Sequence, residues 1–160
     1  MMGFIIRLFV RGDAVLSEAR PRDAAAIAAL HGASFHRGWN EGEIEGLLID
    51  RNVVAHRAMI GRRLVGFILS RRVAGEAEIL SVAVDAARRG KGLSRPLLDL
   101  HLRRLAAFGT HAVFLEVDED NVPARRLYAR AGFREVGRRE AYYRDQPGRR
   151  AAALVLRRDL

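Results

Sequence analysis

Hydrophobic positions along the chain follow two periods, one of two residues and one of three to four residues. The first is typical of strands, and the second is typical of helices that bury one side. The strand pattern covers residues 14–20, 53–60, 64–72, 76–85, 111–118, 133–144 and 151–158. The helix pattern covers residues 23–35, 40–49, 93–105 and 121–131. This alternation predicts an α/β fold with a mixed sheet.

Local signals refine the ends of these elements. Asp23, after Pro21, is predicted to cap the first helix, and Asn40 with Glu43 three residues later predicts a capping box for the second. Gly132 is the expected left-handed end of the last helix. Residues 53–60 and 64–72 are expected to form a hairpin around residues 61–63.

The strand at 76–85 carries a second prediction. Its period of two places Leu80, Val82 and Val84 on one face of the sheet. We therefore expect all three side chains to pack against the same layer.

A glycine-rich turn, residues 86–94, joins this strand to a helix whose leucines recur every three or four residues. Unpartnered amides at a helix N-terminus, together with glycine, form an anion site, and Arg88, Arg89 and Lys91 add positive charge. The turn matches neither the nucleoside-triphosphate loop nor the dinucleotide fingerprint, so a diphosphate on another carrier is favoured. A solvated tight turn explains the two glycines equally well.

Composition narrows the class of protein. The chain has 160 residues, no cysteine and a net charge of +9, with Lys91 its single lysine. One domain is expected, without disulfides or thiolate metal sites. Scattered arginines make nucleic acid an unlikely main partner and suit an anionic cofactor. No run of apolar residues is long enough to span a membrane and no leader pattern precedes residue 10, so a cytoplasmic location is the expectation.

Arg89-Gly90-Lys91-Gly92-Leu93-Ser94 resembles the pyrophosphate signature of the GCN5-related N-acetyltransferase (GNAT) superfamily, with serine where that family has glycine or alanine. The resemblance covers residues 14–160 and leaves 1–13 as an extension. It implies a mostly antiparallel sheet flanked by helices, with a splayed central strand pair. It also implies that the chain binds acetyl-coenzyme A. The implied cofactor residues are Val82, Ala83, Val84, Arg89, Gly90, Lys91, Gly92, Leu93, Ser94, Arg95 and Asn121.

The match continues through residues 115–117, Asn121, Tyr128 and 132–133, and it looks most like the subgroup that acetylates the N-terminal alanine of a small-subunit ribosomal protein. It implies that Glu116 is the general base and Tyr128 the general acid of an N-acetyltransferase. From the residues alone, Glu116 is also explained as an exposed strand carboxylate and Tyr128 as a core tyrosine. Ala151-Ala152 departs from an acidic position of that subgroup, so the exact peptide stays open.

The remaining candidates concern the acceptor. Trp39, Tyr142 and Tyr143 are candidate walls of a peptide groove, although aromatic residues also simply pack. The five histidines show no paired metal spacing, and no metal is expected. A protein N-terminus is the favoured acceptor; a small amine such as a polyamine, amino acid or antibiotic, or a module that binds coenzyme A without turnover, are the alternatives.

Overall fold

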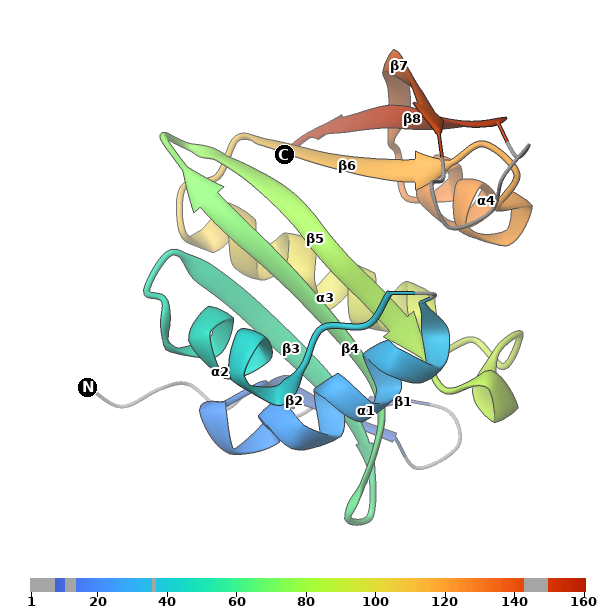
Figure 1. Cartoon of the computed structure of the whole chain (residues 1–160). Helices are drawn as coiled ribbons and strands as arrows, with labels where there is room; N and C mark the ends of the chain where they lie inside the picture. Colours follow the sequence, from blue (N-terminus) through green and yellow to red (C-terminus); the bar gives the residue numbers. More distant parts are fainter. Residues whose placement is uncertain (1–7, 11–13, 36, 143–149) are drawn as a thin grey trace.

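The computed structural model describes residues 8–10, 14–35, 37–142 and 150–160. Its centre is one eight-stranded sheet with the order β1-β2-β3-β4-β5-β6-β8-β7 (Figure 1). The strands are β1 (Leu8–Val10), β2 (Ala14–Glu18), β3 (Val53–Ile60), β4 (Arg63–Val73), β5 (Glu76–Val84), β6 (Ala112–Asp118), β7 (Arg134–Tyr142) and β8 (Arg150–Asp159). The helices are α1 (Ala24–Ser34), α2 (Glu41–Ile49), α3 (Ser94–Ala107) and α4 (Val122–Arg130), with short 3-10 helices at Pro21–Asp23 and Ala86–Arg88.

Neighbouring strands are antiparallel except β5 and β6, which run parallel. The predicted fold class is therefore confirmed, including the hairpin of β3 and β4. The edge strand β1 comes from the segment 1–13 and pairs with β2, so part of the expected extension belongs to the sheet.

The splay of the central strands is also confirmed. β5 and β6 pair at only three positions, the last of which joins Glu78 to Phe114. Beyond this position the two strands separate, as Figure 1 shows along the length of β5. Among the described residues, no strand pairs with the edge of β5 that faces β6 from residue 79 to the end of β5.

Two apolar layers cover the sheet, one on each face. α3 packs on one face against β3, β4 and β5, and the core there also contains Leu115, Val117 and Tyr128. α1 and α2 cover the other face, where Ile27, Ile44 and other apolar residues pack on β3, β4 and β5. In Figure 1, α1 and α2 lie in front of the sheet and α3 lies behind it.

The prediction that Leu80, Val82 and Val84 share one face is wrong for Leu80. Leu69 pairs with Ser81 and Ser70 pairs with Ile79, so Leu80 is the extra residue of a β-bulge. Val82 and Val84 pack in the α3 layer, whereas Leu80 lies on the side of α2. A period of two cannot reveal the bulge, because one inserted residue changes the phase of the strand.

The two predicted caps of the first helices have different outcomes. Asn40 Oδ1 accepts from the Glu43 amide at 2.9 Å and Glu43 Oε2 accepts from the Asn40 amide at 2.8 Å, so this capping box is confirmed. The prediction for Asp23 is wrong, because the preceding 3-10 turn gives Asp23 helical backbone angles and its side chain caps no amide of α1. Its carboxylate instead accepts from the Arg20 amide at 2.7 Å and forms an ion pair with Arg57.

A chain of three polar side chains crosses the α3 layer of the core. Ser70 Oγ lies 2.6 Å from His101 Nε2, and His101 Nδ1 lies 2.7 Å from His56 Nδ1. Ser70 and His101 are fully buried, and His56 is 4% exposed. Burial lowers the pKa of His56 to about 4, with a smaller contribution from Arg104. Burial, with a smaller contribution from His56, also lowers the pKa of His101 well below its ordinary value. Both rings are therefore neutral at physiological pH, each with one donor and one acceptor nitrogen.

Candidate functional site

The turn between β5 and α3 has the backbone geometry of an anion site. Gly90 and Gly92 have φ values of +74° and +77°, in the left-handed region that favours glycine. No described atom lies within 4 Å of a Cβ built at either position, so their requirement is conformational and the backbone lies open to a ligand. Leu93 is buried and ties this open turn to the core.

Amide donors are available along this turn. The backbone hydrogen bonds among the described residues include no acceptor for the amides of Gly90, Gly92, Leu93, Ser94 and Arg95. α3 begins at Ser94, so the serine that departs from the family signature keeps a helical backbone and an available amide. Lys91 is exposed beside these donors. The residues present therefore fit a pyrophosphate group.

Arg89 has a second role in the turn. Its Nε donates to the carbonyl oxygen of Val84 at 3.2 Å, so the side chain folds back onto the end of β5. On the other side of the turn, Asp85 accepts from the Ala87 amide and from Arg63. The Ala87 hydrogen bond, with smaller contributions from Arg63 and Arg88, lowers the pKa of Asp85. These contacts join the predicted phosphate turn firmly to the predicted pantetheine strand, residues 82–84.

Glu116 lies on β6 two residues beyond the last position that pairs with β5. Its neighbours Leu115 and Val117 are buried in the α3 layer, so the Glu116 side chain points to the opposite face, that of α1 and α2. The carboxylate is half-exposed and accepts from Arg139 Nη2 of β7 at 2.8 Å. No sequence pattern predicted Arg139 as the partner of Glu116, because the strand order β6-β8-β7 brings together residues far apart in the chain.

Tyr128 lies on the other side of β6. Its ring is 5% exposed, packs in the α3 layer and contacts Phe133 edge-on, with 5.6 Å between the centroids. Burial raises the pKa of the Tyr128 hydroxyl to about 12, so it is a proton donor at neutral pH. Glu116 and Tyr128 thus flank the splay from opposite faces rather than touching each other.

Asn121 is placed at the start of α4 by its own side chain. Its Oδ1 accepts from the Ala124 amide at 3.2 Å, so it caps the helix that carries Tyr128. The side-chain amide group of Asn121 is exposed and can still donate.

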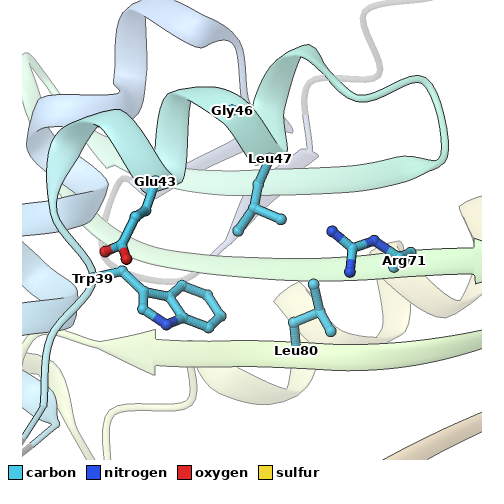
Figure 2. A pocket seen from close by; sticks show the side chains of 6 residues that line it. All are labelled: Trp39, Glu43, Gly46, Leu47, Arg71 and Leu80. Atoms are coloured by element: carbon cyan, nitrogen blue, oxygen red, sulfur yellow. The ribbon is translucent and has the colours of Figure 1, made fainter.

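A pocket of about 370 Å3 opens on the α2 side of the sheet (Figure 2). Leu47 of α2 and Leu80 of the β5 bulge point toward each other across it, the Glu43 carboxylate lies near the Trp39 indole, and Arg71 of β4 lies near Leu80. Trp39, one of the three aromatic residues predicted to form a peptide groove, therefore lines a pocket. For Tyr142 only the backbone is described, and Tyr143 lies outside the described residues.

No group of three or more histidine or acidic side chains with metal-binding geometry occurs within the described part of the chain. Among the same residues, no helix combines the length and the apolarity that a membrane crossing needs. The sequence analysis predicted neither the pocket on the α2 side nor the burial of His56 and His101. For His101 a signal did exist, since it lies four residues from Leu97 and Leu105 on the buried stripe of α3.

Comparison with known proteins agrees with this geometry. The chain is 32% identical over 93 residues to the ribosomal protein bS18-alanine N-acetyltransferase of Escherichia coli, covering 58% of this chain and 63% of that protein. It is 39% identical over 107 residues to the N-alpha-acetyltransferase RimI of Mycobacterium tuberculosis, covering 64% of this chain and 63% of that protein. Each alignment spans just under two thirds of the relative's own length.

Solved structures share the fold. The crystal structure of the ribosomal-protein-S18-alanine N-acetyltransferase from Escherichia coli superposes with a TM-score of 0.83, at 23% identity and with 91% and 93% of the two chains covered. Ard1 from Thermoplasma volcanium superposes with a TM-score of 0.80 at 25% identity, over 92% and 97% of the two chains. Residues 24–133, more than half of the chain, match the Acetyltransferase (GNAT) family. The glycine turn, the splayed strands and this match together show that the chain belongs to the GNAT family.

Proposed function

We propose that this chain transfers an acetyl group from acetyl-coenzyme A to the N-terminal α-amine of a protein. The observation that carries the proposal is the separation of β5 and β6 beyond Glu78 and Phe114. It leaves an open strand edge that leads to the phosphate turn, and it leaves a carboxylate, Glu116, beside the opening.

The cofactor side of the proposed site is built from backbone. The amides of Gly90, Gly92, Leu93, Ser94 and Arg95 would hold the pyrophosphate, with the exposed Lys91 side chain beside it and Arg89 fixing the turn. The open edge of β5 at Val82, Ala83 and Val84 would pair with the pantetheine arm as an added strand would. Asn121 would donate a hydrogen bond to the same arm while its oxygen caps α4.

The chemistry assigns one proton transfer to each face of the splay. Glu116 accepts a proton from the acceptor ammonium, directly or through water, and the neutral amine attacks the acetyl carbonyl carbon. A strand amide within residues 82–84 stabilises the negative charge that develops on the carbonyl oxygen. As the C–N bond forms and the C–S bond breaks, the nitrogen releases its extra proton to water, and Tyr128 donates its proton to the leaving sulfur and then regains one from water. The products are an N-acetylated amine and coenzyme A.

A protein acceptor is supported by relatives named for acetylation of a ribosomal protein and for N-alpha-acetylation. The half-exposed position of Glu116 suits a chain that arrives from solvent, since a long acceptor cannot enter a closed cavity. An acceptor of this class would place the enzyme in the cytoplasm, with no requirement for nucleic acid.

A second candidate acceptor is a small amine. A Clavibacter michiganensis protein named mycothiol acetyltransferase is 43% identical over 74 residues, although this covers only 24% of that protein. The pocket at Trp39 and Leu80 is the place where such a molecule would bind.

One experiment separates these functions. Release of free thiol from acetyl-coenzyme A would be measured against peptides that differ in their first residue and, in parallel, against polyamines, amino acids and aminoglycosides. We expect release with peptides, and mass spectrometry should place the acetyl group on the α-amine. Release with small amines alone would exclude the protein acceptor, and tight cofactor binding without release against any amine would identify a non-catalytic module.

A further inference from the structure

The carboxylate proposed as the general base already binds a cation of the chain itself. Arg139 Nη2 donates to Glu116 Oε2 at 2.8 Å, and both side chains are open to solvent. The ammonium of an acceptor would make a charge-assisted hydrogen bond of the same kind with this carboxylate. The guanidinium and the acceptor ammonium therefore compete for one position on Glu116.

The register of the sheet explains how Arg139 reaches this carboxylate. β8 lies between β7 and β6, and on it Glu116 pairs with Val155 while Arg139 pairs with Ala153. Leu154 packs in the α3 layer, so Val155 and Ala153 face the other side of the sheet, that of Glu116. Neighbouring strands lie about 4.8 Å apart, so the two side chains bridge about 10 Å between β7 and β6. The small methyl group of Ala153 leaves the path across β8 open.

This part of the sheet lies apart from the helices of the same face. α1 packs on β4 and β5, and α2 packs on β3. In Figure 1, β6, β8 and β7 lie beyond β5, on the side away from α1 and α2. The Arg139 side chain is exposed there, so its guanidinium can leave Glu116 for water without disturbing the core.

A general base beside an acetyl thioester does not by itself distinguish an amine from water. If Glu116 took a proton from water, the water oxygen would attack the acetyl carbon. The C–S bond would then break, and Tyr128 would protonate the sulfur. The products would be acetate, coenzyme A and one proton, so the acetyl group would be lost without transfer. An acetyltransferase has to suppress this side reaction.

Arg139 makes the exchange at Glu116 selective for charge. An ammonium that displaces the guanidinium keeps the carboxylate paired with a cation, because one positive charge replaces another. Water is neutral and would leave the carboxylate without its ion pair. For an exposed pair this difference corresponds to about three- to fivefold in rate or affinity.

We propose that Arg139 is a specificity-determining residue, which occupies Glu116 until a cationic amine displaces it and so protects bound acetyl-coenzyme A from hydrolysis. This inference rests on the proposed function. Without an acceptor, the carboxylate stays paired with the guanidinium. A protein N-terminus that arrives as an ammonium takes the place of the guanidinium, gives a proton to Glu116 and attacks as the neutral amine.

The test compares the wild-type enzyme with Arg139→Gln, with and without a peptide that begins with alanine. Thiol release from acetyl-coenzyme A in the absence of peptide should rise by about three- to fivefold in the variant, with acetate as the second product in NMR. KM for the peptide should fall by a similar factor with kcat unchanged, because the acceptor no longer has a cation to displace. A residue that only positions Glu116 would lower kcat and leave release without peptide unchanged.

Three further variants connect the effect to this ion pair. Arg138→Gln removes a pair of the same length, 2.8 Å to Glu119, from the neighbouring position of β7, and should behave as the wild-type enzyme. Arg139→Lys keeps a cation and should keep the low release without peptide. Adding Glu116→Gln to Arg139→Gln should abolish the additional release, since the proposed base is then absent.

The outcomes separate the two proposals. If Arg139→Gln keeps the wild-type rate of release without peptide, or if Arg138→Gln raises it equally, the assignment of Arg139 is overturned and the peptide acetyltransferase stands. If the wild-type enzyme acetylates no peptide, both are overturned.

Discussion

Arg139 Nη2 lies 2.8 Å from Glu116 Oε2 and joins β7 to β6 across the intervening strand β8. Both side chains are more than a third exposed, at 67% and 39%. Ion pairs with this exposure contribute little to stability, roughly 0–1 kcal/mol. The Arg139 guanidinium can therefore be displaced at small cost, and an acceptor ammonium can take its place beside the Glu116 carboxylate.

Glu116→Gln should lower kcat by roughly 100- to 10,000-fold, the usual contribution of a positioned general base. The Kd for acetyl-coenzyme A should stay unchanged, because the phosphate turn and the β5 edge do not involve this side chain. Thiol release and calorimetry measure the two quantities. Glu119→Gln is the matched control, since Glu119 also pairs with an arginine of β7, Arg138, at 2.8 Å. Equal loss in both variants would remove Glu116 from the mechanism.

Tyr128→Phe should reduce kcat by a similar factor while the protein stays folded, because the ring still packs against Phe133. The folded-state pKa of about 12 is above the ordinary value of 10.0, so the neutral hydroxyl is favoured by folding. The stability linked to this group is complete below pH 10 and is lost as pH rises from 10 through 12. The free energy of unfolding, measured with denaturant at several pH values, should therefore depend on pH differently in the wild-type protein and the variant only between pH 10 and pH 12. Wild-type turnover in the variant would exclude Tyr128 as the acid.

Gly92→Ala should weaken binding of acetyl-coenzyme A by tenfold or more in calorimetry. A residue with a Cβ at φ +77° costs about 1–2 kcal/mol, so the turn would change its backbone angles and misplace its amides. Gly61→Ala is the control, since Gly61 has φ +57° and open space around it but lies in the β3–β4 turn. The Gly61→Ala variant should lose a comparable amount of stability and bind acetyl-coenzyme A with unchanged affinity. Unchanged affinity in Gly92→Ala would contradict the proposed phosphate turn.

Acid should destabilise the protein through the buried histidines. The pKa of His56 falls from 6.5 to about 4 on folding, so its stability contribution is complete above pH 6.5 and is lost as pH falls toward 4. A difference of this size corresponds to on the order of 3 kcal/mol. Urea unfolding at several pH values should show that the free energy of unfolding declines as the pH falls. His56→Gln should make this decline with pH less steep.

His111 provides the comparison for this prediction. Its side chain is exposed, so the free energy of unfolding of His111→Gln should decline with falling pH as steeply as that of the wild-type protein. Unfolding free energies of the wild-type protein that do not change between pH 7 and pH 4.5 would contradict the role of the His56–His101–Ser70 chain.

Much of the fold follows from local patterns. The strands and helices were predictable because their apolar periods are long, and the Asn40–Glu43 box and the Gly90 and Gly92 turn depend on residues close in sequence. These local features require no knowledge of which strands become neighbours. The splay of β5 and β6 does require it, and it was predicted only through the resemblance to a known family.

The remaining features depend on tertiary contacts. The bulge at Leu80 arises from the pairing of β4 with β5, and Arg139 meets Glu116 only because β8 inserts between β6 and β7. The ion pair between Asp23 and Arg57, which lies on β3, is likewise a contact between residues far apart in the chain. The α2 pocket likewise needs three elements in place. The hydrophobic period of a sequence describes one helix or strand at a time, so it cannot predict contacts between elements that are far apart in the chain.

The bulge also gives β5 a change of phase along its length. Ala77 and Ile79, at odd positions, face the α3 layer at the beginning of the strand, whereas Val82 and Val84, at even positions, face it at the end. Deleting one residue of the bulge, Leu80 or Ser81, would restore a uniform alternation and leave Val82 and Val84 on the α3 side. An unbulged strand with the same sequence would instead turn Val82 and Val84 away from α3. The bulge therefore decides which side chains of the terminal half of β5 belong to the core.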